Sequence, residues 1–426
     1  MSYEYIDTDV EYIGTIPKTW DLVRNKHLFN KTKVIVGPNW DKYNVLSLTK
    51  KGVIIKDIEN NQGKMPSDFS IYQLVNPGNL LMCLFDIDVT PRCVGYIENK
   101  GIVSAAYTEL TPVEEIDMKY YYWWYLMLDI DKQLLHLSKN LRNSLSTEDF
   151  MALSVVKPPI KEQQQIANYL DKQTAKIDAT IAKNEELIEL LEEKRVALIN
   201  QVVTKGLNPD VPMKDSGIEW IGEIPEHWEV DKLKKFFFIH NGSTPKDIEE
   251  NWGGDICWIT PADYKTSDVY INRSSRQITK VGLNSCGTTL VPKGSIIVSN
   301  RAPIGTVAIA NTELCTNQGC KSLSIKKDIN TKFVYYALSI NEKELNKLGR
   351  GTTFMELSSY DLGTFPIPIV PLSEQETIVI YLDKEISKIN ETLTKIQENI
   401  NLLEEYKTSL IHHVVTGKID VRGEEI

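Results

Sequence analysis

"EQQQIANYLDKQTAKIDATI" (residues 162–181) and "EQETIVIYLDKEISKINETL" (residues 374–393) decide the organisation of this chain, because they align over their whole length without a gap. The segments after them, "LLEEKRVALINQVVTKG" (190–206) and "LLEEYKTSLIHHVVTGK" (402–418), match at the same offset along the chain. Internal repeats have to be settled before a fold is assigned, since they fix the number of structural units. One long segment is therefore present twice.

A shorter motif repeats upstream of each copy. "YIGTIPKTW" (12–20) and "WIGEIPEHW" (220–228) share the pattern IGxIPxxW at nearly the same offset. Each half of the chain runs from this motif, through a variable middle, to the segment that contains "YLDK". A period of about half the chain indicates a tandem duplication of domains and not a solenoid of short repeats.

Both repeated segments have the apolar spacing of a coiled-coil helix. Alternate steps of three and four from Val379 to Val414 meet apolar residues at ten of eleven positions, and the first copy has eight. This heptad pattern predicts two long helices, each with one apolar seam. The polar members of the first copy are Thr174, Asn184 and Arg195, which weaken the seam and can fix its register. The predicted seam comprises Leu170, Ile177, Ile181, Ile188, Leu191, Leu198, Leu382, Ile389, Leu393, Ile400, Leu403 and Leu410.

The ends of both helices are marked in the sequence. "SEQE" (373–376) has capping-box spacing after Pro371, and Gly206 and Gly417 stand where the helices are expected to stop. Each helix is predicted to span about 43 residues, roughly 64 Å. Because such a rod must bury its apolar stripe, we expect the two helices of one chain to pack antiparallel. A parallel dimer of two chains is the alternative.

The composition is that of a globular chain with several domains. The chain has 426 residues, 42% of them hydrophobic, which is enough for two to four domains with separate cores. It has no run of 18 apolar residues and no basic-then-apolar leader, so we expect no membrane segment and a cytoplasmic location. The six cysteines form no C-x-x-C pair, which favours reduced and mostly buried thiols. No metal site is expected.

The distribution of charge along the chain bears on nucleic-acid binding more than the total net charge does. A net charge of −10 argues against a phosphate-binding partner, because such binding depends on lysine and arginine. Each half nevertheless has one basic stretch, residues 18–56 with a net +7 and residues 264–312 with a net +5. Each stretch can form a patch for a polyanion, while a solvated surface of mixed charge explains it equally well.

The two middles are rich in short β-branched and aromatic runs punctuated by glycine and proline. This pattern predicts short strands joined by turns, with helices near residues 118–128 and 332–338. The middles share a frame but few residues, for example Gly78 with Gly294 and Leu145 with Leu357. A common scaffold with divergent content suggests two different reading surfaces.

Candidate reading residues follow from the chemistry of the DNA major groove. Arginine and lysine pair with guanine, and asparagine pairs with adenine, although phosphate contacts are the commoner role of such side chains. The candidates in the first middle are Lys50, Lys51, Arg92, Lys139, Asn140, Arg142 and Asn143. The candidates in the second are Tyr264, Lys265, Arg273, Arg276, Asn300, Arg301, Arg350 and Thr352.

The sequence contains none of the common catalytic motifs. It has no G-x-G-x-x-G after a strand, no P-loop, no H-E-x-x-H and no G-x-S-x-G. "NPGN" (76–79) and "NPDV" (208–211) lack the second proline and the aromatic residue of the N-P-P-[YF] motif of amino-methyltransferases. We therefore predict no catalytic residues and a chain that recognises its target without transforming it.

Several of these segments together resemble a known family. "GIEWIGEIPEHWEV" (217–230), "PLSEQETIVIYLD" (371–383), "VVTGKIDVR" (414–422) and the tandem plan are similar to the specificity subunit of Type I restriction-modification enzymes. The similarity covers nearly the whole chain and is weakest in the variable middles.

The resemblance implies an α+β fold: two tandem mixed α/β target-recognition domains, separated by two long helices that form an antiparallel coiled coil. It implies target-recognition domains at residues 1–159 and 207–371, a spacer helix at 160–206, and a second spacer helix with the C-terminal tail at 372–426. Each domain would read one half of a split site in double-stranded DNA.

The resemblance also implies partners and cofactors. Two methyltransferase subunits would dock on the helices and domains, and restriction and translocation subunits would join for cleavage. S-adenosylmethionine, ATP and magnesium would be bound by those partners and not by this chain. Two other classes stay open, a structural coiled-coil scaffold without DNA specificity and a stand-alone nuclease or methyltransferase.

Overall fold

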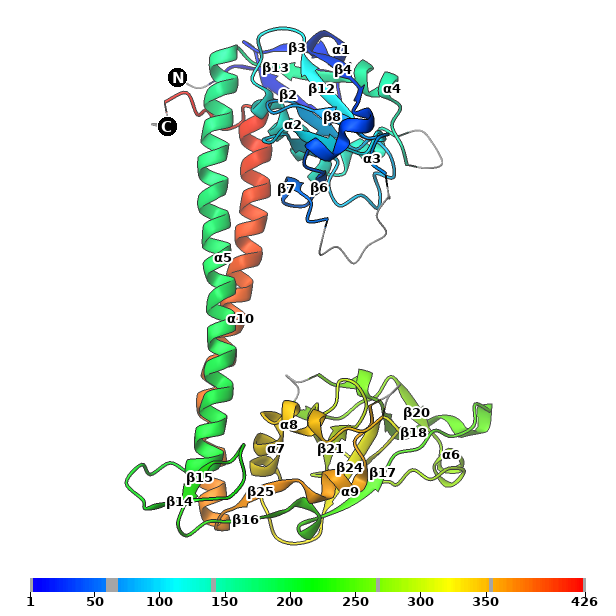
Figure 1. Ribbon diagram of the computed structural model, residues 1–426, viewed down its shortest axis with the longest axis vertical. Helices are drawn as coiled ribbons and strands as arrows, with labels where there is room; N and C mark the ends of the chain where they lie inside the picture. Colours follow the sequence, from blue (N-terminus) through cyan, green and yellow to red (C-terminus); the bar gives the residue numbers. More distant parts are fainter. Residues whose placement is uncertain (1–2, 59–67, 139–142, 266–268, 352–354, 424–426) are drawn as a thin grey trace. The chain divides into compact units, whose positions relative to one another are not determined.

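The protein was analysed as a computed structural model, which describes residues 3–58, 68–138, 143–265, 269–351 and 355–423. The chain forms two compact units (Figure 1). Unit 1 comprises Met1–Glu185 and Gln397–Ile426, and unit 2 comprises Glu186–Ile396. The long helices α5 (Ile160–Lys205) and α10 (Leu372–Val415) are each divided between the two units. Unit 1 therefore combines the first half of the sequence with the end of the second.

Unit 1 is a mixed α/β body built on short strands. A four-stranded sheet has the order β10-β9-β12-β4, and a three-stranded sheet has the order β11-β8-β5, all with antiparallel pairs. The remaining strands pair as β1-β2, β3-β13 and β6-β7. The strands are β1 (Tyr5–Asp7), β2 (Thr15–Pro17), β3 (Asp21–Arg24), β4 (Phe29–Thr32), β5 (Val34–Ile35), β6 (Leu46–Thr49), β7 (Gly52–Ile55), β8 (Gln73–Val75), β9 (Leu80–Met82), β10 (Val94–Tyr96), β11 (Gly101–Val103), β12 (Thr108–Pro112) and β13 (Ser154–Lys157).

Besides its parts of α5 and α10, unit 1 has one helix of 13 residues and several short ones. Helix α2 (Met118–Ile130) is almost wholly apolar, and Tyr120, Tyr121 and Trp124 on it are fully buried in the core. The side chain of Asp117 caps its first turn by accepting the amide of Tyr120 at 3.0 Å. The other helices are α1 (Asn25–Leu28), the 3-10 turn η1 (Gly37–Lys42), α3 (Gln133–His136) and α4 (Thr147–Ala152).

Unit 2 repeats this plan with different detail. Its five-stranded sheet has the order β17-β24-β21-β22-β19, and its three-stranded sheet has the order β20-β18-β23. Two pairs, β18 with β23 and β19 with β22, are parallel. The strands are β14 (Met213–Asp215), β15 (Glu223–Pro225), β16 (Glu229–Lys232), β17 (Phe237–Asn241), β18 (Trp252–Ile259), β19 (Tyr270–Ile271), β20 (Arg276–Ile278), β21 (Ile296–Ser299), β22 (Val307–Ala310), β23 (Leu314–Thr316), β24 (Cys320–Ile325) and β25 (Pro366–Ile369).

The helices of unit 2 fall at the places expected from unit 1. Helix α7 (Thr331–Ser339) is capped by Asn330, as α2 is capped by Asp117. The predicted helices at 118–128 and 332–338 are thus confirmed. The remaining helices are α6 (Lys280–Asn284), α8 (Glu342–Lys347), α9 (Ser359–Thr364), η2 (Leu233–Lys235), η3 (Glu249–Asn251) and η4 (Pro261–Asp263).

The sheets confirm the duplication read from the sequence. The strand order β4-β12-β9-β10 of unit 1 recurs as β17-β24-β21-β22 in unit 2. Gly78 and Gly294, paired in the sequence, both have positive φ just before β9 and β21, and their amides donate at 2.8 Å to the carbonyls of Ile97 and Ala310. Glycine suits this turn because its backbone tolerates positive φ. The shared frame is therefore a shared backbone path.

The two long helices begin and end in the same way. The carbonyl of Pro159 accepts the amides of Glu162 and Gln163 at 2.8 and 3.0 Å, and the carbonyl of Pro371 accepts the amides of the equivalent residues of α10 at 2.9 Å. The capping box predicted at 373–376 is wrong, because α10 begins at Leu372 and Ser373 therefore lies inside its first turn and not at the N-cap position. Gly206 and Gly417 both have φ of +72° and stop the helices as expected.

Within each unit the two long helices run in opposite directions. In unit 1, Lys407 contacts Asp178 at 2.6 Å and Asn184 donates to Asn399 at 3.0 Å, so residue numbers rise on one helix as they fall on the other. In unit 2, Arg195 Nη1 lies 3.5 Å from Asn390 Oδ1 and Gly206 lies against Glu374, so residue numbers again rise on one helix as they fall on the other. Two of the three polar seam residues thus make cross-helix contacts.

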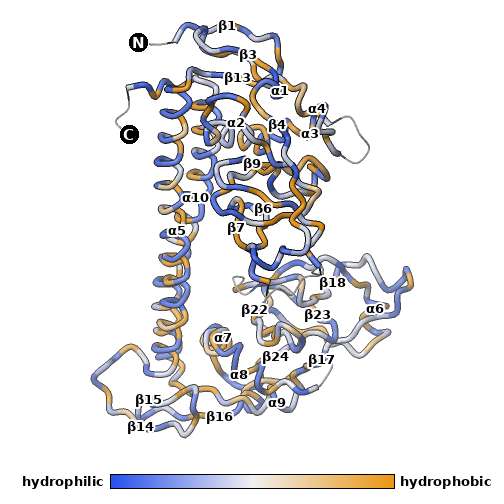
Figure 2. The backbone as a smooth tube through the Cα atoms, turned by 45° about the horizontal axis from the view of Figure 1, so that its top comes forward, coloured by the Kyte–Doolittle hydropathy of each residue, from blue (hydrophilic) through white to orange (hydrophobic). Residues whose placement is uncertain are grey.

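The predicted seam residues are all shielded from solvent to some degree. Leu170, Ile177, Leu382, Ile389, Ile400 and Leu410 are buried, and the other six are half-buried. Hydrophobic and hydrophilic residues alternate along both helices in Figure 2, as an amphipathic helix requires. None of the helices in the described ranges is both long and apolar enough to cross a membrane.

The "YLDK" aspartates attach each long helix to its globular body. Asp171 accepts hydrogen bonds from the ammonium of Lys119 and from Trp123 Nε1, the latter at 2.9 Å. Asp383 accepts in the same way from Lys332 Nζ at 2.7 Å and from the hydroxyl of Tyr336 at 2.5 Å. In both cases the donors are a lysine and an aromatic residue one turn apart on α2 or α7. The repeated phrase is thus a repeated anchor.

The IGxIPxxW motif forms a second anchor at the helix ends. Trp20 Nε1 donates to Glu162 at 2.8 Å, and Trp228 Nε1 donates to Glu374 at 3.2 Å. A Cβ atom on Gly417 would lie 2.5 Å from Pro17, so only glycine fits where α10 ends against this motif. Each motif therefore contacts the start of one long helix and the end of the other.

Candidate nucleic-acid interface

A polar cluster in unit 2 joins two loops that are far apart in the sequence. Asn300 and Arg301 directly follow β21, and Glu356 precedes α9. Glu356 Oε1 accepts from Asn300 Nδ2 at 3.0 Å, while Glu356 Oε2 accepts from Arg301 Nε and Nη2 at 3.2 and 3.0 Å. The backbone of Leu357 donates to the carbonyl of Asn300 at 2.9 Å. The fold therefore places these side chains together although several strands and helices separate Arg301 from Glu356 along the chain.

Three more charged residues surround this cluster. Lys321 on β24 is 7% exposed, donates to Asn241 at 2.7 Å and lies 3.8 Å from Glu356. Burial lowers the pKa of the Lys321 ammonium from its usual value, and the nearby Glu356 carboxylate partly opposes this shift. Arg350 Nη2 donates to Asp361 at 3.0 Å and is largely exposed. The cluster thus presents two exposed guanidinium groups supported by buried or half-buried carboxylates.

Unit 1 has the same pair of loops. The amide of Leu145 donates to the carbonyl of Leu84 at 2.8 Å, which is the counterpart of the bond from Leu357 to Asn300. Ser146 and Ser358 then cap α4 and α9, each accepting the amide of an aspartate at 3.0 Å. In unit 1 the loop after β9 therefore meets the loop before α4. In unit 2 the loop after β21 meets the loop before α9 in the same way.

The candidates of the first middle fall partly on this loop pair. The carbonyl of Asn143 accepts the amide of Ile87 at 3.0 Å, which joins the two loops of unit 1. Lys139, Asn140 and Arg142, together with Thr352 of the second middle, lie outside the described residues.

Lys50, Lys51 and Arg92 form a separate group in unit 1. The two lysines are the exposed turn of the β6-β7 hairpin, and Arg92 Nη1 donates to the hydroxyl of Tyr122 at 3.2 Å. The three residues line a cavity of about 410 Å³ together with Tyr122 and Lys407. The structure thus brings these candidates together beside the long helices, with Arg92 at the end of the loop after β9 and the two lysines on another hairpin.

The other candidates of the second middle are dispersed. Tyr264 is 4% exposed, and its hydroxyl donates to the carbonyl of Thr306 at 3.4 Å, so it belongs to the core of unit 2. Arg276 stacks on the ring of Trp252 at 3.5 Å and contacts Asp247 at 3.0 Å. Lys265 and Arg273 are exposed.

Sequence reasoning missed Glu356 and Lys321, which link the candidates of unit 2. An acidic residue is not an obvious choice for a DNA-binding surface, and the spacing along the chain carries no signal for contacts between such distant segments. Among the described residues, no group of three or more His, Cys, Asp or Glu side chains has the geometry to hold a metal ion.

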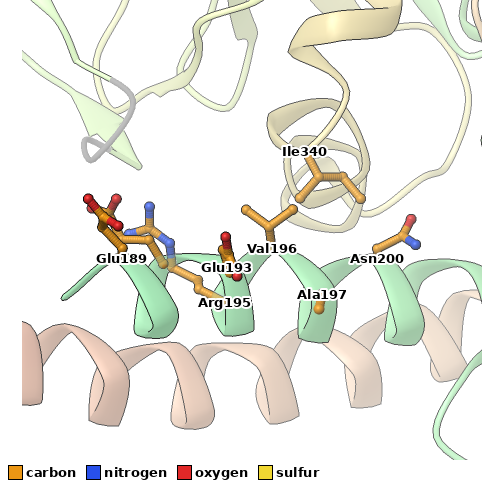
Figure 3. A pocket seen from close by; sticks show the side chains of 8 residues that line it. Glu189, Glu193, Arg195, Val196, Ala197, Asn200 and Ile340 are labelled. Carbon is orange, nitrogen blue, oxygen red and sulfur yellow. The ribbon is translucent and has the colours of Figure 1, made fainter. Parts of the chain in front are cut away.

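Two matched grooves lie on the long helices, one in each unit. The α5 groove of unit 2 has a volume of about 640 Å³ and the α10 groove of unit 1 about 650 Å³. In Figure 3, Glu193, Val196 and Asn200 of α5 point toward Ile340, which follows α7. The α5 groove is lined by Glu189, Glu192, Glu193, Arg195, Val196, Ala197, Asn200 and Ile340, and the α10 groove by Asp131, Asn401, Glu404, Glu405, Thr408, Ser409, His412 and His413.

The grooves are equivalent under the repeat. Glu192 and Glu193 align with Glu404 and Glu405 in the second copy. Leu190 and its counterpart Leu402 are adjacent to these glutamates, and they are 54% and 62% exposed. These leucines lie outside the seam, and both copies have one at the same position.

Comparison with known proteins points to the same family that the sequence motifs resemble. The model of the family described as "Type I restriction modification DNA specificity domain" matches residues 92–189 and 225–402. The chain is 39% identical over 186 residues to the Type I restriction enzyme MjaIX specificity subunit of Methanocaldococcus jannaschii, a match that spans 41% of this chain and 43% of that protein. It is 27% identical over 433 residues to the putative type I restriction enzyme MjaX specificity subunit of the same organism, over 96% of each chain.

Two solved structures share the fold. A chain from a study of complex assembly and conformational transition of the type I R-M system aligns with a TM-score of 0.74 at 16% identity, over 95% of this chain and 99% of that one. The HsdS subunit of Thermoanaerobacter tengcongensis aligns with a TM-score of 0.55 at 17% identity, over 95% and 98%.

A duplicated α/β frame with a different polar loop pair in each copy defines a recognition protein with two reading bodies. The chain belongs to the Type I restriction modification DNA specificity domain family. The predicted membership of the specificity-subunit family is confirmed, and with it the role in DNA recognition.

Proposed function

We propose that this chain is the specificity subunit of a Type I restriction-modification complex, in which each globular body reads one half of a split DNA target. The observation that carries the proposal is the equivalent loop pair in both units. It occupies the same place on the same sheet, but it presents Asn300, Arg301 and Arg350 in one unit and different side chains in the other. A fixed scaffold with exchanged contact residues is what two independent half-sites require.

The long helices act in this proposal as an antiparallel coiled coil that sets the gap between the half-sites. Support comes from the opposite direction of the helices within each unit and from the anchors at Asp171 and Asp383. Both bodies have to reach the major groove from one side of the duplex, so the half-sites are separated by about one helical turn, 34–36 Å, or a multiple of it.

The matched grooves support docking of two methyltransferase subunits, one at each groove. Each groove is lined by two consecutive glutamates, and an exposed leucine outside the lining lies one helical turn before the second of them, which suits a partner segment with basic and apolar side chains. S-adenosylmethionine, ATP and magnesium then belong to the methyltransferase and to the restriction subunits that join it, and this chain itself has no catalytic role.

Mapping of methylated adenines in a host genome, with and without this gene, tests the proposal. We expect one split motif, with two specified halves and a fixed gap, to lose methylation when the gene is deleted. Replacement of residues 207–371 by the corresponding segment of a relative should change one half of the motif and leave the other half unchanged. An unchanged methylation map after deletion of the gene would favour a scaffold role instead.

A further inference from the structure

The guanidinium of Arg301 is held by only one of its edges. Nε and Nη2 both donate to Glu356 Oε2, and no hydrogen bond involves Nη1 within the described ranges. The side chain is 47% exposed, and the end formed by Nη1 and Nη2 has hydrogens that Glu356 does not use. An arginine fixed in this way keeps its planar fork in one orientation.

The carboxylate that holds Arg301 is itself fixed from several sides. Glu356 Oε1 accepts from Asn300 Nδ2, and Lys321 Nζ lies 3.8 Å away. The backbone of Glu356 exchanges two hydrogen bonds with Arg350, at 3.0 and 3.1 Å. Asn300 is fully buried, and its carbonyl is tied to the amide of Leu357. Glu356 is therefore a rigid support and not a mobile surface carboxylate.

We propose that Glu356 is a positioning residue that presents the distal end of Arg301 to a guanine base in the half-site read by unit 2. The inference rests on the proposed function, because it names one base within that target. Guanine offers O6 and N7 as two acceptors in the major groove, and a planar guanidinium end matches both at once. The same fork can pair with a phosphate, but a lysine ammonium also satisfies a phosphate contact as a point charge, so replacement by lysine separates the two roles.

The side-chain chemistry separates this role from a purely structural one. If Glu356 served only to neutralise Arg301 and Lys321, its loss would weaken folding and leave base preference unchanged. If Arg301 served only as a phosphate contact, lysine would replace it with little effect on base preference. A guanine contact depends on the fork, which lysine lacks.

The experiment uses the full chain with its methyltransferase subunits on a DNA library in which both half-sites are randomised. The variants are Arg301→Lys and Glu356→Gln, with Glu344→Gln as the control, a carboxylate of the same unit that pairs with the exposed Lys347 at 2.7 Å. Methylated molecules are sequenced, and the preference at each position is compared with that of the native complex. The ratio of guanine to the next base is the measured quantity.

We expect both variants to reduce the preference for guanine at one shared position of the unit 2 half-site by about 10- to 100-fold. The unit 1 half-site should keep its native preference in both variants, and the Glu344→Gln control should keep the whole native motif. A loss of methylation that is uniform across all sequences, with the preference for guanine unchanged, would indicate a phosphate contact and overturn the inference. An Arg301→Lys motif identical to the native one would also overturn it.

The experiment distinguishes failure of the proposed function from failure of the guanine contact alone. A native complex that methylates no split motif refutes the proposed function and, with it, the guanine contact. A split motif that persists unchanged in Arg301→Lys refutes only the guanine contact. Because Arg301 is exposed, this variant is expected to fold even if Glu356→Gln does not.

Discussion

At the residue scale, the duplicated chain repeats its internal contacts more faithfully than its sequence. Gln163 and Gln375 each accept a backbone amide at 2.8 Å from the residue that caps α2 or α7, and each donates to a backbone carbonyl at 2.7 Å. The anchor of Asp171 uses a tryptophan where that of Asp383 uses a tyrosine. The acceptor is thus kept while the donor varies. This is physically reasonable, because either ring offers one polar hydrogen to a carboxylate.

Replacement of Asp383 tests the anchor. Asp383→Asn removes the charged acceptor of Lys332 and Tyr336, so we expect the free energy of unfolding of unit 2 to fall by about 1–2 kcal/mol, a value that allows for partial exposure of the pair. Thermal unfolding followed by circular dichroism measures the change. Glu398→Gln, at an exposed position of the same helix, is the control. Equal melting temperatures for native chain and Asp383→Asn would contradict an anchoring role.

At the scale of the element, the long helices combine two separate surfaces. The seam residues face the other helix, while Leu190, Glu192 and their counterparts face outward. Both surfaces recur at the same offset in the second copy. An insertion therefore preserves the seam and the outward surface together only if its length keeps the heptad phase.

Insertion of whole heptads tests the role of the helices in setting the gap. Seven residues inserted into both helices, after Glu185 and after Ile396, keep the seam in phase and add about 10 Å, or about three base pairs. We expect a longer permitted gap with both half-sites unchanged, read from the methylated motif. Four residues inserted into one helix alone should alter the gap or abolish methylation, since the seam loses its phase. A change in half-site bases would contradict the division of roles.

At the scale of the whole molecule, charge limits what the chain does alone. The net charge of −10 opposes binding to DNA, although each half has a basic stretch. Of the basic residues in the site of unit 2, Lys321, Arg301 and Arg350 are all paired with acidic groups, which reduces their long-range attraction for phosphate.

We therefore expect weak DNA binding by the isolated chain and much tighter binding after the methyltransferase subunits are added. The affinity of the complex should fall steeply between 50 and 200 mM salt, on the order of 10³-fold or more. Fluorescence anisotropy with a labelled duplex, titrated with and without the partner subunits, measures both effects. Tight binding by the chain alone that is insensitive to salt would refute this expectation.

The sequence by itself determined the duplication, the two long helices and their stopping points. The helices and their stopping points depend on local signals, namely heptad spacing and glycine, which act through residues near one another in the chain. The duplication is visible because the two copies can be aligned directly. The family also followed from the sequence, because its motifs lie in the repeated segments and not in the variable middles. The capping box expected at 373–376 is an exception, since α10 begins at Leu372 and Ser373 lies inside its first turn.

Only the tertiary structure decided which polar residues act together. Tyr264 satisfied a chemical criterion for base reading, yet it packs into the core, because burial depends on neighbours from other strands. Glu356 met no criterion in the sequence, and it became central once sheet pairing brought the two loops of unit 2 into contact. Local pattern encodes where helices and strands form, whereas the grouping of side chains depends on contacts between distant segments that no local pattern contains.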